Sequence, residues 1–313
     1  MSLNRPVLGL SLAIGYCLST SIAFVGSLYF LVPSHIRQLD RDHPSQIKWR
    51  SFATGCVCVA ALAGQAYLLG TNEEKTAPIE PLVTKFYPQS VQHTLLSSAK
   101  VLAHVAVLYT GSILDTFLLV WAYMTKHRAS RPPTTLEYLK SLYSFCLEPH
   151  VRSLTFANSG GWMAWRNVII APVLEEVAFR VGMVPILLAA GMRPVTVYWT
   201  APLFFGVAHA HHAAQRLRRG TLPAIVIAQT TFQFSYTTLF GAYAAYIYVH
   251  TRSATAIAIA HGFCNLMGLP NFQFFQRQHD LFKYRWALLS AHIFGLTCFI
   301  GVLVQGLLTS GQD

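Results

Sequence analysis

The sequence predicts an all-α, polytopic membrane protein with about eight transmembrane helices in one bundle. Of its 313 residues, 53% are hydrophobic and only 11% are charged, whereas soluble domains carry about 25% charged residues. Several apolar runs reach the ~18 residues or more that are typical of a membrane-crossing helix. Lysine and arginine gather in alternate loops between these runs. These three observations predict a single transmembrane domain over residues 1–313.

Each predicted helix is an apolar run long enough to cross the hydrocarbon core with some tilt, or to enter it as a re-entrant segment. The first run is too long for the apolar part of a cleaved signal peptide, so it is predicted to be a retained anchor. The two long loops, 71–100 and 125–162, are expected to hold short interfacial helices. In chain order the predicted helices cover residues 7–32, 52–70, 101–124, 163–190, 194–213, 222–249, 254–270 and 286–309.

The net charge of +11 is explained by the membrane rather than by a nucleic acid. Basic residues concentrate in loops 33–51, 125–162, 214–221 and 271–285, and the positive-inside rule places such loops in the cytoplasm. The partner that the charge predicts is therefore the lipid bilayer, and no nucleic-acid partner is expected. The six cysteines lie mostly in apolar runs without zinc-type pairs, which is typical of small packing residues.

Two adjacent glutamates stand out in the fourth predicted helix. Residues 149–312 contain only three carboxylates, and Glu175 and Glu176 are two of them. Residues four apart on a helix are neighbours, so Glu176 is predicted to form an ion pair with Arg180. Glu175 points about 100° away from that pair. A packing role needs only one glutamate, so Glu175 is a candidate general base, as ionisable residues inside membranes are usually functional.

Two later helices carry further polar candidates near their cytoplasmic ends. His209 follows the apolar segment that contains Phe205, and His261 and Asn265 share one face of their helix at i and i+4. A single histidine in such a helix is more often a packing residue. The predicted topology, however, brings these positions to one side of the membrane, so a carboxylate, two histidines and an amide are expected to converge in a cavity open to the cytoplasm.

Three chemistries fit these residue types. A glutamate and a histidine can activate water while a second histidine and an asparagine stabilise an oxyanion. Glutamate and histidine can instead hold a zinc ion, although the sequence has no HExxH motif. A thiol mechanism through Cys264 ranks last, because no cation stands near it in the sequence to favour the thiolate.

Three motifs in order identify a resemblance. "EEVAFR" at 175–180, "FGVAH" at 205–209 and "HGFCN" at 261–265 resemble the CaaX prenyl protease 2 family, the eukaryotic type II CaaX endopeptidases of the ABI superfamily. The likeness is strong over about residues 160–270, the expected catalytic core. It implies an endopeptidase of the endoplasmic reticulum membrane that removes the aaX tripeptide from isoprenylated CaaX proteins, such as Ras-like small GTPases.

By matching position, the resemblance assigns Glu175 and His209 to water activation, and His261 and Asn265 to the oxyanion site. Glu176 and Arg180 would be the supporting pair, with Phe205 shaping the site. It implies no cofactor, and it leaves the metal, thiol and glutamate chemistries open.

Two rival functions come from other classes. A membrane transporter would use the same residues as an ion path, and a scaffold would use them for packing alone. The clustering of polar residues towards one side of the membrane favours a site over a path. His104 and Asp115, in the third predicted helix, are assigned no role.

Overall fold

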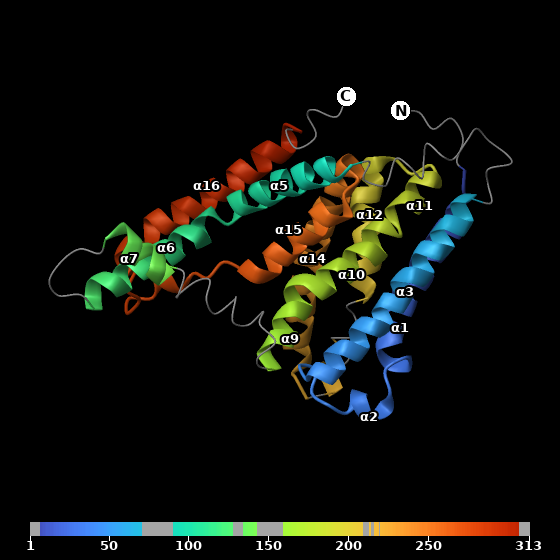
Figure 1. The fold of residues 1–313 in the computed structure, drawn as a ribbon, viewed down its shortest axis with the longest axis horizontal. Helices are drawn as coiled ribbons and strands as arrows, with labels where there is room; N and C mark the ends of the chain where they lie inside the picture. Colours follow the sequence, from blue (N-terminus) through green and yellow to red (C-terminus); the bar gives the residue numbers. More distant parts are fainter. Residues whose placement is uncertain are drawn as a thin grey trace. The chain divides into compact units, whose positions relative to one another are not determined.

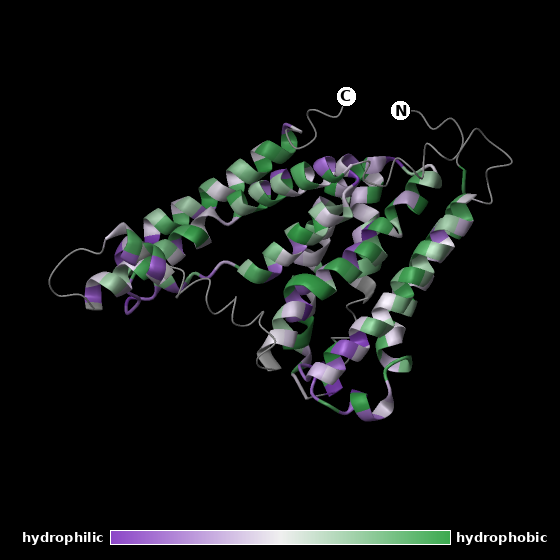
Figure 2. Ribbon diagram, in the orientation of Figure 1, coloured by the Kyte–Doolittle hydropathy of each residue, from purple (hydrophilic) through white to green (hydrophobic). Residues whose placement is uncertain are grey.

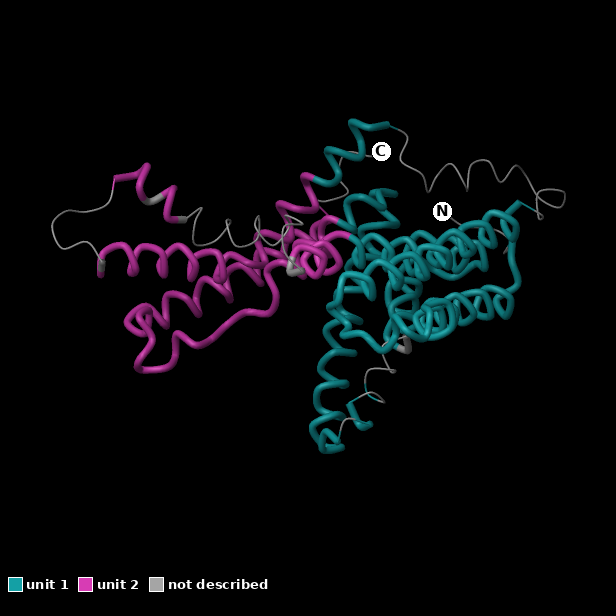
Figure 3. The backbone as a smooth tube through the Cα atoms, turned by 60° about the horizontal axis from the view of Figure 1, so that its bottom comes forward, with its two compact units in different colours: residues 1–98, 170–258 teal, residues 99–169, 259–313 magenta. Residues whose placement is uncertain are grey.

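The computed structural model describes residues 7–70, 90–127, 134–142, 159–208, 213, 216–218 and 220–306, and within these ranges the chain is mostly helical and contains no strand. His209 lies outside the described residues. The described chain forms two compact units, each built from two separate segments (Figure 3). Unit 1 comprises residues 1–98 and 170–258, and unit 2 comprises 99–169 and 259–313. The single domain predicted from the sequence stays a prediction.

Unit 1 contains the longest helices. Besides the start of α5, these are α1 (Leu10–Phe30), α2 (Ser34–Arg37), α3 (Pro44–Gly70), α10 (Ala171–Glu176), η3 (Val177–Val181), α11 (Val184–Ala189), α12 (Pro194–Ala208) and α14 (Pro223–Thr251) (Figure 1). Its core includes fully buried side chains of the segment from Phe179 to Leu187. α3, α12 and α14 all pack against η3, so this short segment lies at the centre of the unit.

Unit 2 contains most of α5 (Val91–Leu108), followed by α6 (Thr110–His127), α7 (Thr135–Leu142), α9 (Ser159–Trp165), η2 (Arg166–Ile170), the second half of α15 (Ala254–Met267), η4 (Gln273–Phe275), η5 (Phe282–Tyr284) and α16 (Arg285–Val304). α6 packs along α16, and Phe274, Leu281 and Leu288 form a buried cluster between them and the η4–η5 loop. α7 begins with a capping box, in which Thr134 and Glu137 bond each other's backbone N–H.

The predicted third helix, residues 101–124, is bent rather than straight, and its crossing of the membrane stays a prediction. The chain bends by 69° between α5 and α6. Thr110 Oγ1 donates to Val107 O at 2.7 Å, which competes with the backbone ladder. Gly295 of α16 also approaches Val107 O, where an added Cβ would lie 2.6 Å away. The bend thus lies beside a carbonyl that two neighbours contact, and a hydropathy pattern does not report such contacts.

By length and composition, three helical segments of the described chain could cross a membrane: Leu10–Phe30, Pro44–Gly70 and Phe282–Val304. The bent pair would make a fourth if it is one span. Figure 2 shows hydrophobic residues along much of α3 and α16, with hydrophilic residues at the start of α3. The protein is thus an all-α polytopic membrane protein, and the number of eight spans stays a prediction.

Candidate active site

The glutamates lie in one helical run, residues 159–189, which passes from unit 2 into unit 1. Two segments of this run, η2 and η3, have π-helical geometry. In a π-helix each carbonyl accepts a hydrogen bond from the N–H five residues later. Val177 O accepts such a bond from Gly182 N–H at 2.9 Å. π turns occur frequently at functional sites. The two glutamates fill the end of α10, between the two π turns.

The predicted ion pair is confirmed. Arg180 Nη1 lies 3.1 Å from Glu176 Oε1, and each side chain is only 1% exposed. The Arg180 guanidinium is 5.1 Å from the centroid of the Phe205 ring, and that ring meets Phe179 edge-on at 4.8 Å. A buried charge is stable only when it is paired and hydrogen-bonded, and Glu176 supplies that partner. The contacts with Phe205 join η3 to α12.

Gly241 of α14 packs closely against the same pair. A Cβ added to it would lie 2.8 Å from Arg180 Nη2 and 2.7 Å from Pro202 Cβ. Nη2 is buried, and it has no hydrogen-bond partner among the described residues. The guanidinium is therefore confined by α12 and α14 as well as by its glutamate.

Glu175 differs from its neighbour in burial. Glu176 is fully buried, whereas Glu175 is half-buried. The adjacent carboxylates therefore have different surroundings: one is committed to a buried ion pair, and the other retains partial access. This division agrees with the prediction that the first supports the site and the second reacts, although the reactive role itself stays a prediction.

His261 and Asn265 lie in unit 2, on one helix as predicted. His261 is 8% exposed, and Asn265, which is exposed, donates from Nδ2 to Asn167 O at 2.9 Å. Gly262 sits directly against Val168 O, where any Cβ would collide. α15 thus contacts the carbonyls of the π turn η2. One N–H of the Asn265 amide is used in this bond, and the second is left for another acceptor.

Gln65, Cys58 and Asn167 are residues that the sequence reasoning missed. Gln65 Nε2 donates to Val181 O at 2.8 Å, and Cys58 Sγ lies 3.3 Å from Leu174 O. A glutamine in an otherwise apolar helix was the available signal for Gln65, because such a side chain requires a partner in a membrane protein. The backbone carbonyl of Asn167 left no signal of this kind.

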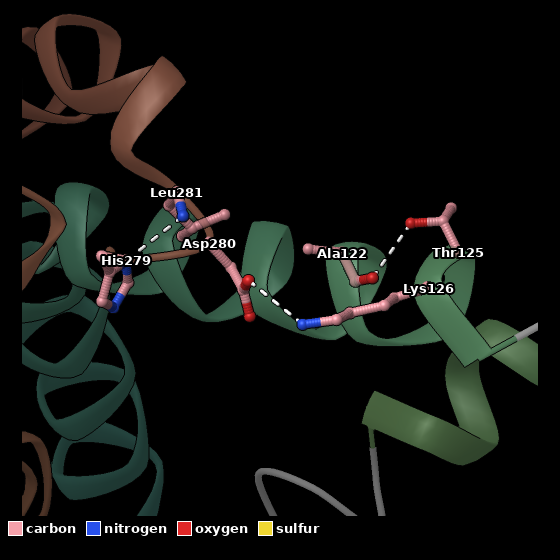
Figure 4. A network of polar contacts seen from close by, with 6 residues as sticks. All are labelled: Ala122, Thr125, Lys126, His279, Asp280 and Leu281. Atoms are coloured by element: carbon pink, nitrogen blue, oxygen red, sulfur yellow. Dashed lines mark hydrogen bonds and ion pairs between the residues drawn. The ribbon is translucent and has the colours of Figure 1, made fainter. Parts of the chain in front are cut away.

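Two further polar contacts lie away from the motifs, one at the surface and one between packed helices. Asp280 Oδ1 lies 3.6 Å from Lys126 Nζ in unit 2, with the side chains 59% and 67% exposed (Figure 4). His104 is buried, its Nε2 is 2.9 Å from Phe299 O, and its ring stacks on that of Phe299. His104 therefore joins α5 to α16.

A metal site was one of the open alternatives. No group of three or more His, Cys, Asp or Glu side chains that could hold a metal ion occurs in the part of the chain that the structure describes. That part leaves out His209, so the zinc alternative stays a prediction.

Comparison with known proteins covers these same motifs. A family model described as "Type II CAAX prenyl endopeptidase Rce1-like" matches residues 157–267. CAAX prenyl protease 2 of Arabidopsis thaliana is 29% identical over 86% of this chain and 84% of the relative. CAAX prenyl protease 2 of Homo sapiens is 33% identical over 81% of this chain and 70% of the relative. The chain belongs to the CAAX prenyl protease 2 family.

Membership in the CAAX prenyl protease 2 family confirms the resemblance predicted from the three motifs, and it makes the chain an enzyme, a CaaX prenyl endopeptidase. A probable CAAX prenyl protease 2 of Schizosaccharomyces pombe is 41% identical over 43% of this chain and 51% of the relative. No solved structure gives a significant match.

Proposed function

We propose that this CAAX prenyl protease 2 family member removes the aaX tripeptide from isoprenylated CaaX proteins by water that Glu175 and His209 activate. The substrates are prenylated proteins such as Ras-like small GTPases. The enzyme would act in the endoplasmic reticulum membrane, with its site open to the cytoplasm, where prenylated C-termini reach the lipid surface. The observation that carries the mechanism is the contrast between half-buried Glu175 and the buried Glu176–Arg180 pair beside it.

The reaction proceeds by general-base attack. Glu175, assisted by His209, takes a proton from a water molecule while the water oxygen adds to the scissile carbonyl carbon. His261 and the second N–H of Asn265 donate hydrogen bonds to the oxyanion that forms. The C–N bond then breaks, and the proton held by Glu175 passes to the departing amine, so that aaX leaves with a free amino terminus.

Glu176 and Arg180 support this chemistry without touching the substrate. Their buried pair supplies the charge balance that keeps η3 folded in an apolar core. Phe205 covers one face of the guanidinium. The bond to Asn167 O fixes the plane of the Asn265 amide, so the amide does not have to reorganise when the oxyanion develops.

The direct test is cleavage of a farnesylated CaaX peptide by the purified protein in detergent. We expect release of aaX by the wild type, loss of at least about 10³-fold in kcat for Glu175→Ala, and full activity in a strong chelator. Activity that is abolished by the chelator and restored by zinc would replace the metal-free mechanism with the zinc alternative. A folded wild type that cleaves none of several CaaX peptides would overturn the proposed substrate.

A further inference from the structure

α3 runs beside the candidate catalytic helix and makes two polar contacts with it, one buried and one part-buried. Cys58 Sγ is 3.3 Å from Leu174 O, and Gln65 Nε2 is 2.8 Å from Val181 O. Each donor is 116 residues before its acceptor, so the two helices run side by side in the same direction over about two turns. The stretch between the two acceptors contains both glutamates and the arginine of the ion pair.

Pro185 explains why Val181 O needs a partner from another helix. In an α-helix this carbonyl would accept the N–H of residue 185, and proline has none. Val181 is buried, and a buried carbonyl without a hydrogen bond destabilises the fold. Gln65, which is 5% exposed, supplies the missing N–H. The side-chain amide of Gln65 therefore replaces the backbone hydrogen bond that Pro185 removes.

The two contacts of α3 are unequal. A thiol is a weak donor, and Leu174 O also accepts the backbone N–H of Val177. The amide of Gln65 is a full donor, and an amide buried in an apolar helix is tolerated only when it is hydrogen-bonded. The Gln65 contact is consequently the stronger restraint, and it acts at the last residue of the π turn, directly after Arg180.

We propose that Gln65 is a positioning residue for the cleavage reaction. By donating to Val181 O it ties the end of η3 to α3, which holds in place Arg180, the preceding residue, and the end of α10 that carries Glu175. Gln65 touches no substrate and acts through this turn. The inference rests on the proposed function, since it assigns the turn a role in that reaction.

The test compares two buried glutamines of α3. Gln65→Met removes the donor at nearly constant volume, and Gln46→Met is the matched control, because Gln46 is also 5% exposed but bonds Leu39 O, outside the catalytic helix. For Gln65→Met we expect kcat on a farnesylated CaaX peptide to fall about 10- to 100-fold with KM unchanged, and amide hydrogen exchange over residues 177–187 to rise. Gln46→Met should leave both at wild-type values.

A double-mutant cycle with Pro185→Ala tests the reason for the contact. This substitution restores a backbone N–H that can bond Val181 O, so the effects of Gln65→Met on kcat and on exchange should shrink in this background. If Gln65→Met alone does not fold, recovery of folded protein in the double variant reports the same coupling. Equal effects in both backgrounds, unchanged exchange in Gln65→Met, or a similar kcat loss in Gln46→Met would each overturn the inference.

The two levels of the proposal fail differently. One outcome is that the wild type cleaves no CaaX peptide while amide hydrogen exchange in the double-mutant cycle changes as expected. That result would support the hydrogen bond and contradict the proposed substrate. If the wild type cleaves the peptide and Gln65→Met keeps full kcat in folded protein, the assignment stands and the positioning role of Gln65 falls.

Discussion

The two π turns of the run 159–189 share a construction and differ in burial. In each, a backbone carbonyl accepts a hydrogen bond from a side-chain amide of another helix. In η3, Val181 O accepts from Gln65, and in η2, Asn167 O accepts from Asn265. Four of the five residues of η3 are buried, whereas none of the five in η2, all of them described, is buried. The same backbone feature thus supports a buried ion pair in one turn and holds an exposed, candidate catalytic amide in the other.

This comparison teaches that the donors should have separable roles. A donor that completes a buried turn should affect folding and geometry together. A donor that completes an exposed turn can be removed with little loss of stability, so its loss should appear mainly in the reaction.

Removing one partner of the buried ion pair should have the largest effect. Arg180→Met leaves the Glu176 carboxylate buried without its cation, and we expect the free energy of unfolding to fall by about 3–5 kcal/mol, as measured by denaturation in detergent. Lys126→Met is the control, since it breaks an exposed pair whose loss costs about 0–1 kcal/mol. Equal losses for the two variants would show that burial does not decide the strength of these pairs.

Asn265→Ala should separate the exposed turn from the buried one. Loss of an oxyanion donor lowers kcat by about 10²- to 10³-fold, and the thermal unfolding midpoint should change little because the bond to Asn167 O is exposed. The neighbouring Cys264→Ala variant should keep wild-type kcat. A large loss in Cys264→Ala would instead favour the thiol mechanism, and wild-type kcat in Asn265→Ala would remove that residue from the reaction.

Gly241→Ala, on α14, should crowd the buried side chain of Arg180 and destabilise the fold. The new Cβ would lie 2.8 Å from Arg180 Nη2, and overpacking of this kind costs about 1–3 kcal/mol. Gly55→Ala on α3 is the control, because its Cβ would meet only Leu174 Cδ2, at an ordinary 4.0 Å. Unfolding experiments on both variants would show whether the space around Arg180 is as tight as the structure indicates.

Cys58→Ala should have the smallest effect. The thiol is a weak donor to a carbonyl that already has a backbone partner, so we expect a loss of about 1 kcal/mol or less in the free energy of unfolding. Cys58→Ser keeps a donor and serves as the comparison. A kcat loss in Cys58→Ala as large as that of Gln65→Met would contradict the ranking of the two contacts.

Features that depend only on residues near one another in the chain could be predicted from the sequence. Apolar runs predicted an all-α membrane protein, because the bilayer requires backbone groups to be bonded within each helix. The i, i+4 spacing predicted the Glu176–Arg180 pair, because helical neighbours meet whatever surrounds them. Three motifs also indicated the family before any comparison. His209 lies outside the described residues, so its place in the site stays a prediction.

The hydrogen bonds between helices could be found only in the folded structure. Gln65 and Val181 are 116 residues apart, and Asn265 and Asn167 are 98 apart. The bend at Tyr109 likewise lies beside a carbonyl that Gly295 of another helix approaches. Helical periodicity reports which face of a helix is apolar, but the partner of a backbone carbonyl depends on which helices pack side by side. That choice is made by the whole fold.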